Sequence, residues 1–291
     1  MVRHLLIRLH DGGSVAMQAD GPEEAIPFDG LAELMNLKTC AAESGSADVE
    51  LVPPDAMPEG RRVLRKTGMT EIAYAPDWSR VLIAGWKKAP SRPHHYNCYI
   101  WQSLLVCSCM NAALRGEDAA LVHGAVLETE RGAVLLFGES GMGKSTAFGR
   151  WRTAGRKGFS DDMALLDFSG DEGEVFVRRM PTWSACREER NEWNYPAGEE
   201  LPLTGVLALG HSESGHDEIV DVSAAQYFAQ CYRSMFYWFL FYTNGLPEDR
   251  KKLLKDRMLC LTETITRRYA PRALLTVPAG GGLAELIEAK L

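Results

Sequence analysis

The stretch Ala133-Val-Leu-Leu-Phe-Gly-Glu-Ser-Gly-Met-Gly-Lys-Ser145 lies near the middle of the 291-residue chain and decides the kind of fold around it. Residues 133–137 are apolar without interruption, which is typical of a strand buried on both faces of a sheet. Glycines at 138, 141 and 143 follow at once, and residues 144–153 have a helical pattern that stops near Gly155. The stretch therefore predicts a strand, a glycine-rich loop and a helix in succession, an arrangement typical of α/β folds.

Residues 138–145 match the Walker A pattern G-x-x-x-x-G-K-[ST]. Glycines let the backbone turn its N–H groups inward, and these groups surround phosphate oxygens together with the free N–H groups of the following helix. The lysine adds a cation for the β- and γ-phosphates, and the next hydroxyl is a natural Mg²⁺ ligand. The sequence thus predicts a binding site for ATP, or alternatively GTP, with Mg²⁺. The predicted nucleotide-binding residues are Gly138, Ser140, Gly141, Met142, Gly143, Lys144, Ser145 and Thr146.

Two adjacent acids are candidates for the proton acceptor and for a further Mg²⁺ ligand. Asp161 and Asp162 follow the predicted helix where the chain re-enters the sheet, and adjacent carboxylates on an extended chain point in different directions. One could face the metal while the other accepts the proton of a substrate hydroxyl. Asp167, which ends the apolar run 163–167, is an alternative metal ligand of the Walker B kind. An ordinary solvated turn at residues 161–162 is a further alternative.

Other candidates flank this core. His123 lies on a predicted strand, residues 121–127, which a short turn joins to the strand entering the loop. Such a hairpin brings the imidazole close to the phosphates, although a histidine on an apolar strand is more often a satisfied core residue. Arg178 and Arg179 either stabilise charge on a transferred phosphoryl group or face solvent at the end of a strand.

The order of His123-Gly124, a hairpin, the loop at 138–145 and Ser160-Asp161-Asp162 resembles the catalytic core of HPr kinase/phosphorylase. That family transfers phosphate from ATP to a serine of a carrier protein, on a P-loop fold similar to phosphoenolpyruvate carboxykinase. The resemblance covers about residues 120–170 and implies that Asp161 is the catalytic base and that Ser145 and Asp162 serve the metal. It also implies that His123 lies in the active site, so the predicted catalytic residues are Asp161, Lys144 and His123.

The chain also departs from that family. Thr146 stands where the bifunctional enzymes usually carry Glu, and the later segment tied to the phosphorylase reaction has no clear counterpart. Closer in pattern are HPr-kinase-related proteins found beside ribosomal-peptide maturation genes. These include lasso-peptide tailoring kinases and SynChlorMet-cassette proteins. That resemblance implies a peptide as the phosphate acceptor.

Two domains are expected, both within an α/β class. Residues 1–92 predict a small β-rich N-terminal domain, with strands at 2–9, 71–74 and 80–84 and a short helix at 31–35. Residues 93–291 predict the P-loop catalytic domain, beginning with a helix at 96–114. A capping box at 223–226 opens an aromatic helix through 242. Core packing, a homo-oligomer interface and a peptide-binding groove all fit that aromatic segment.

Composition narrows the partners and the location. The net charge of −7 is spread along the chain, without the basic stripe that nucleic-acid binding needs. The N-terminal residues alternate and carry charge, unlike a signal peptide, and the longest apolar stretch, Met235–Tyr242, is far shorter than the roughly 20 residues of a membrane span. These features predict a cytoplasmic protein that binds neither nucleic acid nor membrane.

The function predicted from these residues is an ATP- and Mg²⁺-dependent kinase that phosphorylates a Ser or Thr of a peptide or small protein. The alternative is a nucleotide-binding ATPase or scaffold that binds a precursor peptide without phosphorylating it. A small-molecule hydroxyl kinase is a third option.

Overall fold

The computed structural model describes residues 2–9, 11–41, 47–66, 69–76, 79–85, 93–181 and 198–291. Within these residues the chain forms two β-sheets and six α-helices, so the predicted mixed α/β class is confirmed. They divide into two compact units, one containing residues 1–119 and 239–254 and the other residues 120–182, 200–238 and 255–291. Each unit is built on one of the sheets.

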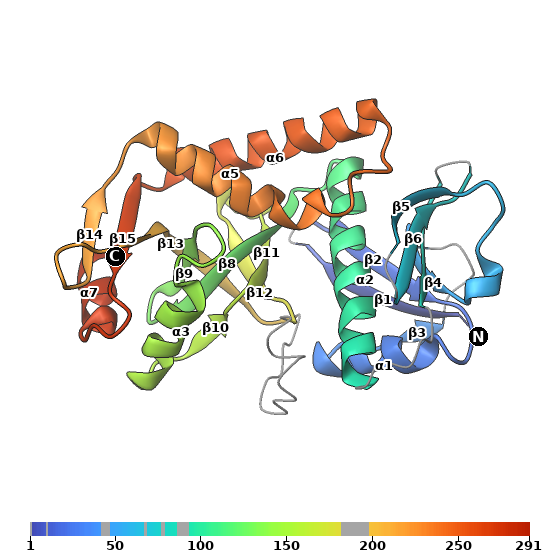
Figure 1. Cartoon of the computed structure of the whole chain (residues 1–291), viewed down its shortest axis with the longest axis horizontal. Helices are drawn as coiled ribbons and strands as arrows, with labels where there is room; N and C mark the ends of the chain where they lie inside the picture. The colour runs from blue at the N-terminus through green and yellow to red at the C-terminus, as the bar shows by residue number, and fades with distance from the viewer. Residues whose placement is uncertain are drawn as a thin grey trace. The chain divides into compact units, whose positions relative to one another are not determined.

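The first sheet mixes parallel and antiparallel strands in the order β3-β1-β2-β4-β7-β6-β5. Its strands β2, β4 and β7 are parallel neighbours, and helix α1 (Ala25–Leu34) lies between β2 and β4 in the chain, where a parallel connection requires a crossover. Helix α2 (Pro93–Arg115) packs on β2, β4, β6 and β7 (Figure 1). The strands are β1 Arg3–Arg8, β2 Ser14–Ala19, β3 Cys40–Ala41, β4 Val49–Val52, β5 Arg62–Lys66, β6 Thr70–Tyr74 and β7 Val81–Gly85.

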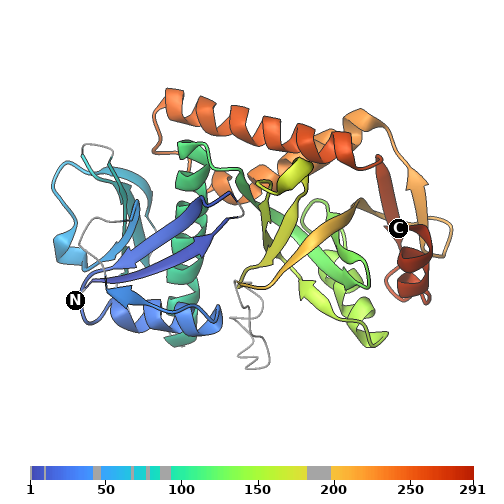
Figure 2. The same cartoon turned by 180° about the vertical axis from the view of Figure 1, so that it is seen from behind.

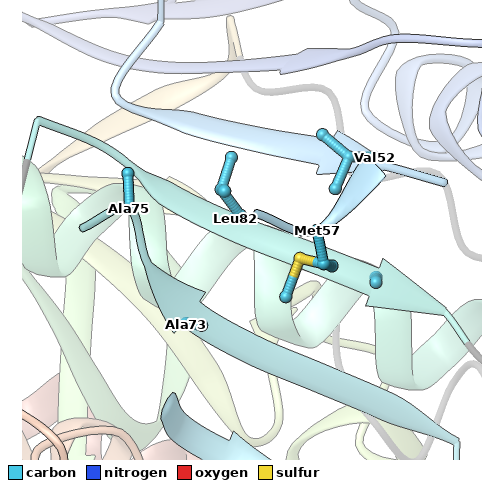
Figure 3. Close-up of a cluster of buried hydrophobic side chains, with 6 residues drawn as sticks. Val52, Met57, Ala73, Ala75 and Leu82 are labelled. Carbon is cyan, nitrogen blue, oxygen red and sulfur yellow. The ribbon is translucent and has the colours of Figure 1, made fainter. Parts of the chain in front are cut away.

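Apolar side chains cover both faces of this sheet. Tyr74 of β6 points to α2, where its hydroxyl donates to Asn111 Oδ1 at 2.6 Å. Its neighbour Ala73 therefore faces the other way, into a cluster of buried side chains: Val52, Met57, Ala73, Ala75, Leu82 and Ala84. Figure 3 shows Met57 beside Val52 and Leu82. Burial on both faces explains why every residue of β6 and β7 is buried.

The second sheet has the order β10-β8-β11-β12-β13-β15-β14, with β9 paired to both β8 and β13. The predicted hairpin is confirmed, because β8 and β9 are antiparallel partners with Gly124 opposite Phe137. Strands β9, β13 and β15 are parallel, so their carboxyl ends lie at one edge of the sheet. The strands are β8 Ala119–Thr129, β9 Gly132–Phe137, β10 Gly158–Ser160, β11 Met163–Asp167, β12 Phe176–Arg179, β13 Glu200–His211, β14 Glu218–Asp221 and β15 Arg272–Thr276.

The second unit also contains α3 (Lys144–Thr153), α7 (Leu283–Lys290) and most of α5 (Ala224–Leu240) and α6 (Glu248–Arg268). The predicted cap of α5 is confirmed, since Ser223 Oγ accepts the backbone N–H of Gln226 at 3.2 Å. Helices α5 and α6 run beside each other (Figure 2), and the Thr262 hydroxyl of α6 reaches Met235 Sδ of α5 at 3.4 Å. No helix in the described ranges has both the length and the apolar character needed to cross a membrane.

The N-terminal region differs from its prediction in detail. The sequence did not predict β2, β3, β4 or β5, and the helix predicted at 31–35 runs from Ala25 to Leu34. Strand β4 is short and carries Glu50, and an acidic residue does not predict a buried strand. In the structure, Arg80 donates a hydrogen bond to the Glu50 carboxylate at 2.6 Å, which explains its burial. Helix α2, which the sequence assigned to the second domain, lies within the first compact unit because it packs on the first sheet.

Candidate functional site

The glycine-rich loop lies where the parallel strands of the second sheet end. Strand β9 stops at Phe137, the loop occupies residues 138–143, and α3 begins at Lys144. A Cβ on Gly138 would lie 3.4 Å from the carbonyl oxygen of Leu209 on neighbouring β13, so the loop leaves the sheet in close contact with that strand. Ligands of open α/β sheets bind outside the carboxyl ends of the strands, which is this edge.

Two loop glycines have the backbone conformation that the predicted cradle needs. Gly141 and Gly143 have φ values of 87° and 91°, a region that other residues rarely adopt. Gly143 is the N-cap of α3, and the described residues supply neither a side-chain cap nor an acid in its first turn. The first turn of α3 therefore supplies no anion of its own to its free N–H groups and positive dipole end, an arrangement suited to a bound phosphate.

Lys144 folds back over the loop. Its side chain is buried, and its Nζ donates to the carbonyl oxygens of Gly138 and Glu139, both at 2.9 Å. Burial lowers the pKa of Lys144, and the negative charge of nearby Asp162 opposes this change. The loop cation and Asp162 are therefore electrostatically coupled. The remaining predicted loop residues are half-buried Met142 and the exposed Ser140, Ser145 and Thr146.

Asp162 and His123 are in contact. The Nε2 atom of His123 lies 3.2 Å from Asp162 Oδ1, and the backbone N–H of Gly124 donates to the Asp162 carbonyl at 3.1 Å. Both contacts arise because β10 and β11 both pair with β8, with residues 161–162 between them. The structure therefore brings together three predicted site residues, His123, Lys144 and Asp162.

Asp161 lies beside this group in a tight turn. The Ser160 hydroxyl donates to the Met163 carbonyl at 2.5 Å across the turn, and Asp161 is half-buried with its Oδ1 atom buried. Of the two acids, Asp162 is the one whose contacts reach His123. Which of the two acids serves as base and which as metal ligand stays a prediction.

The alternative metal ligand, Asp167, lies at the other end of β11, about 17 Å along the strand from residue 162 at roughly 3.3 Å per residue. It is fully buried and accepts hydrogen bonds from the backbone and hydroxyl of Ser169 at 3.1 and 2.5 Å. Arg178 lies 3.4 Å from it and 2.5 Å from Glu200. Arg179 stacks 4.6 Å over the Phe159 ring. These contacts tie Asp167 and both arginines into the body of the sheet.

Helix α5 adds residues that the sequence reading did not assign to the site. The ring of Tyr237 stacks on His123, with centroids 4.0 Å apart, and Trp238 meets the imidazole edge-on at 5.7 Å. Burial raises the pKa of Tyr237, and the charge of Asp162 adds to this effect. One turn earlier, Arg233 Nη1 pairs with Glu139 Oε1 of the loop at 2.5 Å. The spacing of four places Arg233 and Tyr237 on one helix face, but no sequence pattern says which strand that face meets.

The described part of the chain has no group of three His, Cys, Asp or Glu side chains arranged to hold a metal ion. A Mg²⁺ ion bound at this edge would take one or two ligands from the protein and the rest from phosphate and water, as is usual for this ion.

Comparison with known proteins identifies the family. The family model described as SynChlorMet cassette protein ScmC matches residues 94–291, which is more than half of the chain. The protein therefore belongs to the ScmC family, as the sequence resemblance indicated. No curated protein matches the chain. The matched region begins at α2 and includes the whole glycine-rich loop, His123 and Asp162.

Proposed function

We propose that this member of the ScmC family is a kinase that transfers the γ-phosphate of ATP to a Ser or Thr hydroxyl of a peptide or small protein. The observation that carries the proposal is the 3.2 Å contact of His123 with Asp162, whose negative charge acts on Lys144 of the glycine-rich loop. A loop that only holds phosphate needs the lysine and the helix terminus. Phosphoryl transfer to a hydroxyl also needs a proton acceptor and metal ligands, and carboxylates such as Asp161 and Asp162 are suited to these roles.

The residues present fit a triphosphate. Space is open around Gly141, where a Cβ would meet no atom within 4 Å, and the α3 terminus offers uncapped N–H groups. The Lys144 ammonium, already desolvated, exchanges two neutral carbonyl acceptors for charged phosphate oxygens. Charge-assisted hydrogen bonds are about twice as strong as neutral ones, so this exchange favours binding.

A bound Mg²⁺ would neutralise the charge of the phosphates, and the Ser145 hydroxyl and the Asp162 carboxylate are the protein groups suited to hold it. His123 orients the Asp162 carboxylate through the 3.2 Å contact, and the ring of Tyr237 stacks on the imidazole face. The substrate hydroxyl oxygen bonds to the γ-phosphorus while the bond to the bridging oxygen breaks, and Asp161 accepts the hydroxyl proton. Positioning and charge supply most of the rate in such a reaction.

The resemblance to HPr kinase supports the acceptor class. The order of His123-Gly124, the loop and Ser160-Asp161-Asp162 is similar to HPr kinase, whose acceptor is a protein serine. Thr146 in place of the Glu usual in the bifunctional enzymes favours forward transfer only.

The test is transfer of label from γ-³²P-ATP with Mg²⁺ to a degenerate library of Ser- and Thr-containing peptides. We expect Asp161→Asn to reduce labelling by about 10²- to 10⁴-fold, the range of general-base catalysis, while ATP binding measured by calorimetry persists. Asp171→Asn, which changes an exposed carboxylate elsewhere in the same unit, is the matched control and should label like the wild type.

The alternative, an ATPase or scaffold module, makes the opposite prediction. It would hydrolyse ATP at the same rate with or without peptide, and no peptide would carry label. Equal labelling by the wild type and Asp161→Asn would instead contradict the assignment of Asp161 as base.

A further inference from the structure

Phosphate-transfer sites often use an arginine beside the lysine and Mg²⁺, because charge is spread over the transferring phosphoryl group. The arginines that the sequence singled out for this role are held elsewhere, Arg178 by Asp167 and Glu200 and Arg179 over Phe159. The structure instead brings Arg233 of α5 to the glycine-rich loop, where it pairs with Glu139.

Helix α5 is anchored on both sides of Arg233. Toward its start, the Tyr227 hydroxyl donates to the Val206 carbonyl of β13 at 3.0 Å, and its ring meets Phe137, the last residue of β9, edge-on. Toward its end, Tyr237 stacks on His123. Arg233 is thus carried over the loop by a helix that is fixed to the strands on either side of it.

In the ion pair of Arg233 with Glu139, a bound phosphate can replace the Glu139 carboxylate as the partner of Arg233. Both side chains are about two-thirds exposed, at 65% and 63%, and ion pairs this exposed contribute little to stability. The Glu139 backbone carbonyl also accepts from Lys144 Nζ, so the arginine lies beside the same loop residue as the phosphate-binding lysine. A guanidinium forms a stronger, bidentate contact with a phosphate than with an exposed carboxylate.

We propose that Arg233 contacts the terminal phosphate of the bound nucleoside triphosphate, leaving Glu139 when the nucleotide binds. This inference rests on the proposed nucleotide site but not on phosphate transfer itself. The arginine therefore discriminates a triphosphate from a diphosphate, and it stabilises the charge on the γ-phosphoryl group.

The test compares the affinities of ADP and the non-hydrolysable β,γ-imido analogue of ATP, both with Mg²⁺, by titration calorimetry. We expect Arg233→Ala to weaken the triphosphate analogue about tenfold or more, the range of hydrogen bonds to charged groups, and ADP by less than about twofold. Glu139→Gln, which releases the arginine without removing it, should bind the analogue at least as tightly as the wild type.

Arg267→Ala is the matched control. It removes an exposed arginine from a similar surface pair with Glu263 on α6, near the amino end of β15 and so at the opposite edge of the sheet from the loop. It should change neither affinity.

Three results would overturn the assignment. One is equal weakening of both nucleotides in Arg233→Ala, and another is no difference from Arg267→Ala. The third is weakening of the analogue in Glu139→Gln as large as that in Arg233→Ala, which would show that the pair maintains the loop conformation. If the wild type binds neither nucleotide, the nucleotide site itself is refuted. Binding that follows the expected pattern without any peptide labelling would refute only the kinase.

Discussion

Gly124 offers the most direct test of how this site is assembled, because its missing side chain allows β8 and β9 to approach each other. A Cβ at this position would lie 2.8 Å from the carbonyl oxygen of Leu136 and 2.7 Å from the Leu135 Cδ1 atom. Optimal carbon contacts are about 3.5–4.0 Å. The leucine methyl can move, but the carbonyl belongs to the hydrogen-bonded hairpin, so the two strands must separate at Gly124.

Gly124→Ala should therefore destabilise the protein. Overpacking of a well-packed interior costs typically about 1–3 kcal/mol, and about 2 kcal/mol corresponds to a decrease in Tm of about 4–8 °C for a unit of this size. The backbone N–H of Gly124 also donates to the Asp162 carbonyl at 3.1 Å, so the same shift disturbs the turn that holds the site acids. Urea unfolding followed by circular dichroism, together with a thermal scan, measures the effect.

Gly149→Ala is the control, because Gly149 lies inside α3 and a Cβ there would meet no atom within 4 Å. Replacing a helical glycine with alanine should stabilise the protein by about 0.5–1 kcal/mol. The two alanine variants thus have opposite predicted signs. If Gly124→Ala were as stable as the wild type, the strands would not be in the close contact described, and the reasoning about the hairpin would be refuted.

Two further predictions concern elements that hold the loop and α5 in place. Asp217 accepts hydrogen bonds from Arg150 of α3 and from the backbone N–H of Val277. Burial alone would raise the pKa of Asp217, but these hydrogen bonds outweigh it and lower the pKa below 3.8. Its stabilising contribution is therefore complete above pH 3.8 and is lost as the pH falls through the folded-state pKa. Asp217→Asn should cost about 3 kcal/mol in urea unfolding at pH 7, with a difference from wild type that narrows in acid; a difference that stays constant to pH 2 would contradict this. Ser223→Ala removes the acceptor for the N–H of Gln226 at the start of α5 and should cost about 1 kcal/mol by the same measurement, so an unchanged unfolding curve would argue against the cap.

Local patterns were sufficient to predict most elements of the second unit. The strand 133–137, the helix 144–153 and its end near Gly155 are observed as β9, α3 and a left-handed Gly155 with φ of 78°. These predictions succeed because apolar runs, glycines and capping residues act within a few positions of the chain. The same method missed β4, where the buried Glu50 is explained only by Arg80, a residue 30 positions later.

The sequence by itself determined the loop, its lysine and the strand and helix around it, because glycine conformations and hydrophobic periodicity are local properties. It also indicated that His123 and an acid at 161–162 belong with that loop. Only the tertiary structure decided that Asp162 is the acid in contact with His123, that Asp167 lies at the far end of β11, and that α5 brings Tyr237 and Arg233 to the site. Those contacts depend on which strands pair and on which face a distant helix packs, and both are set by the burial of the whole unit.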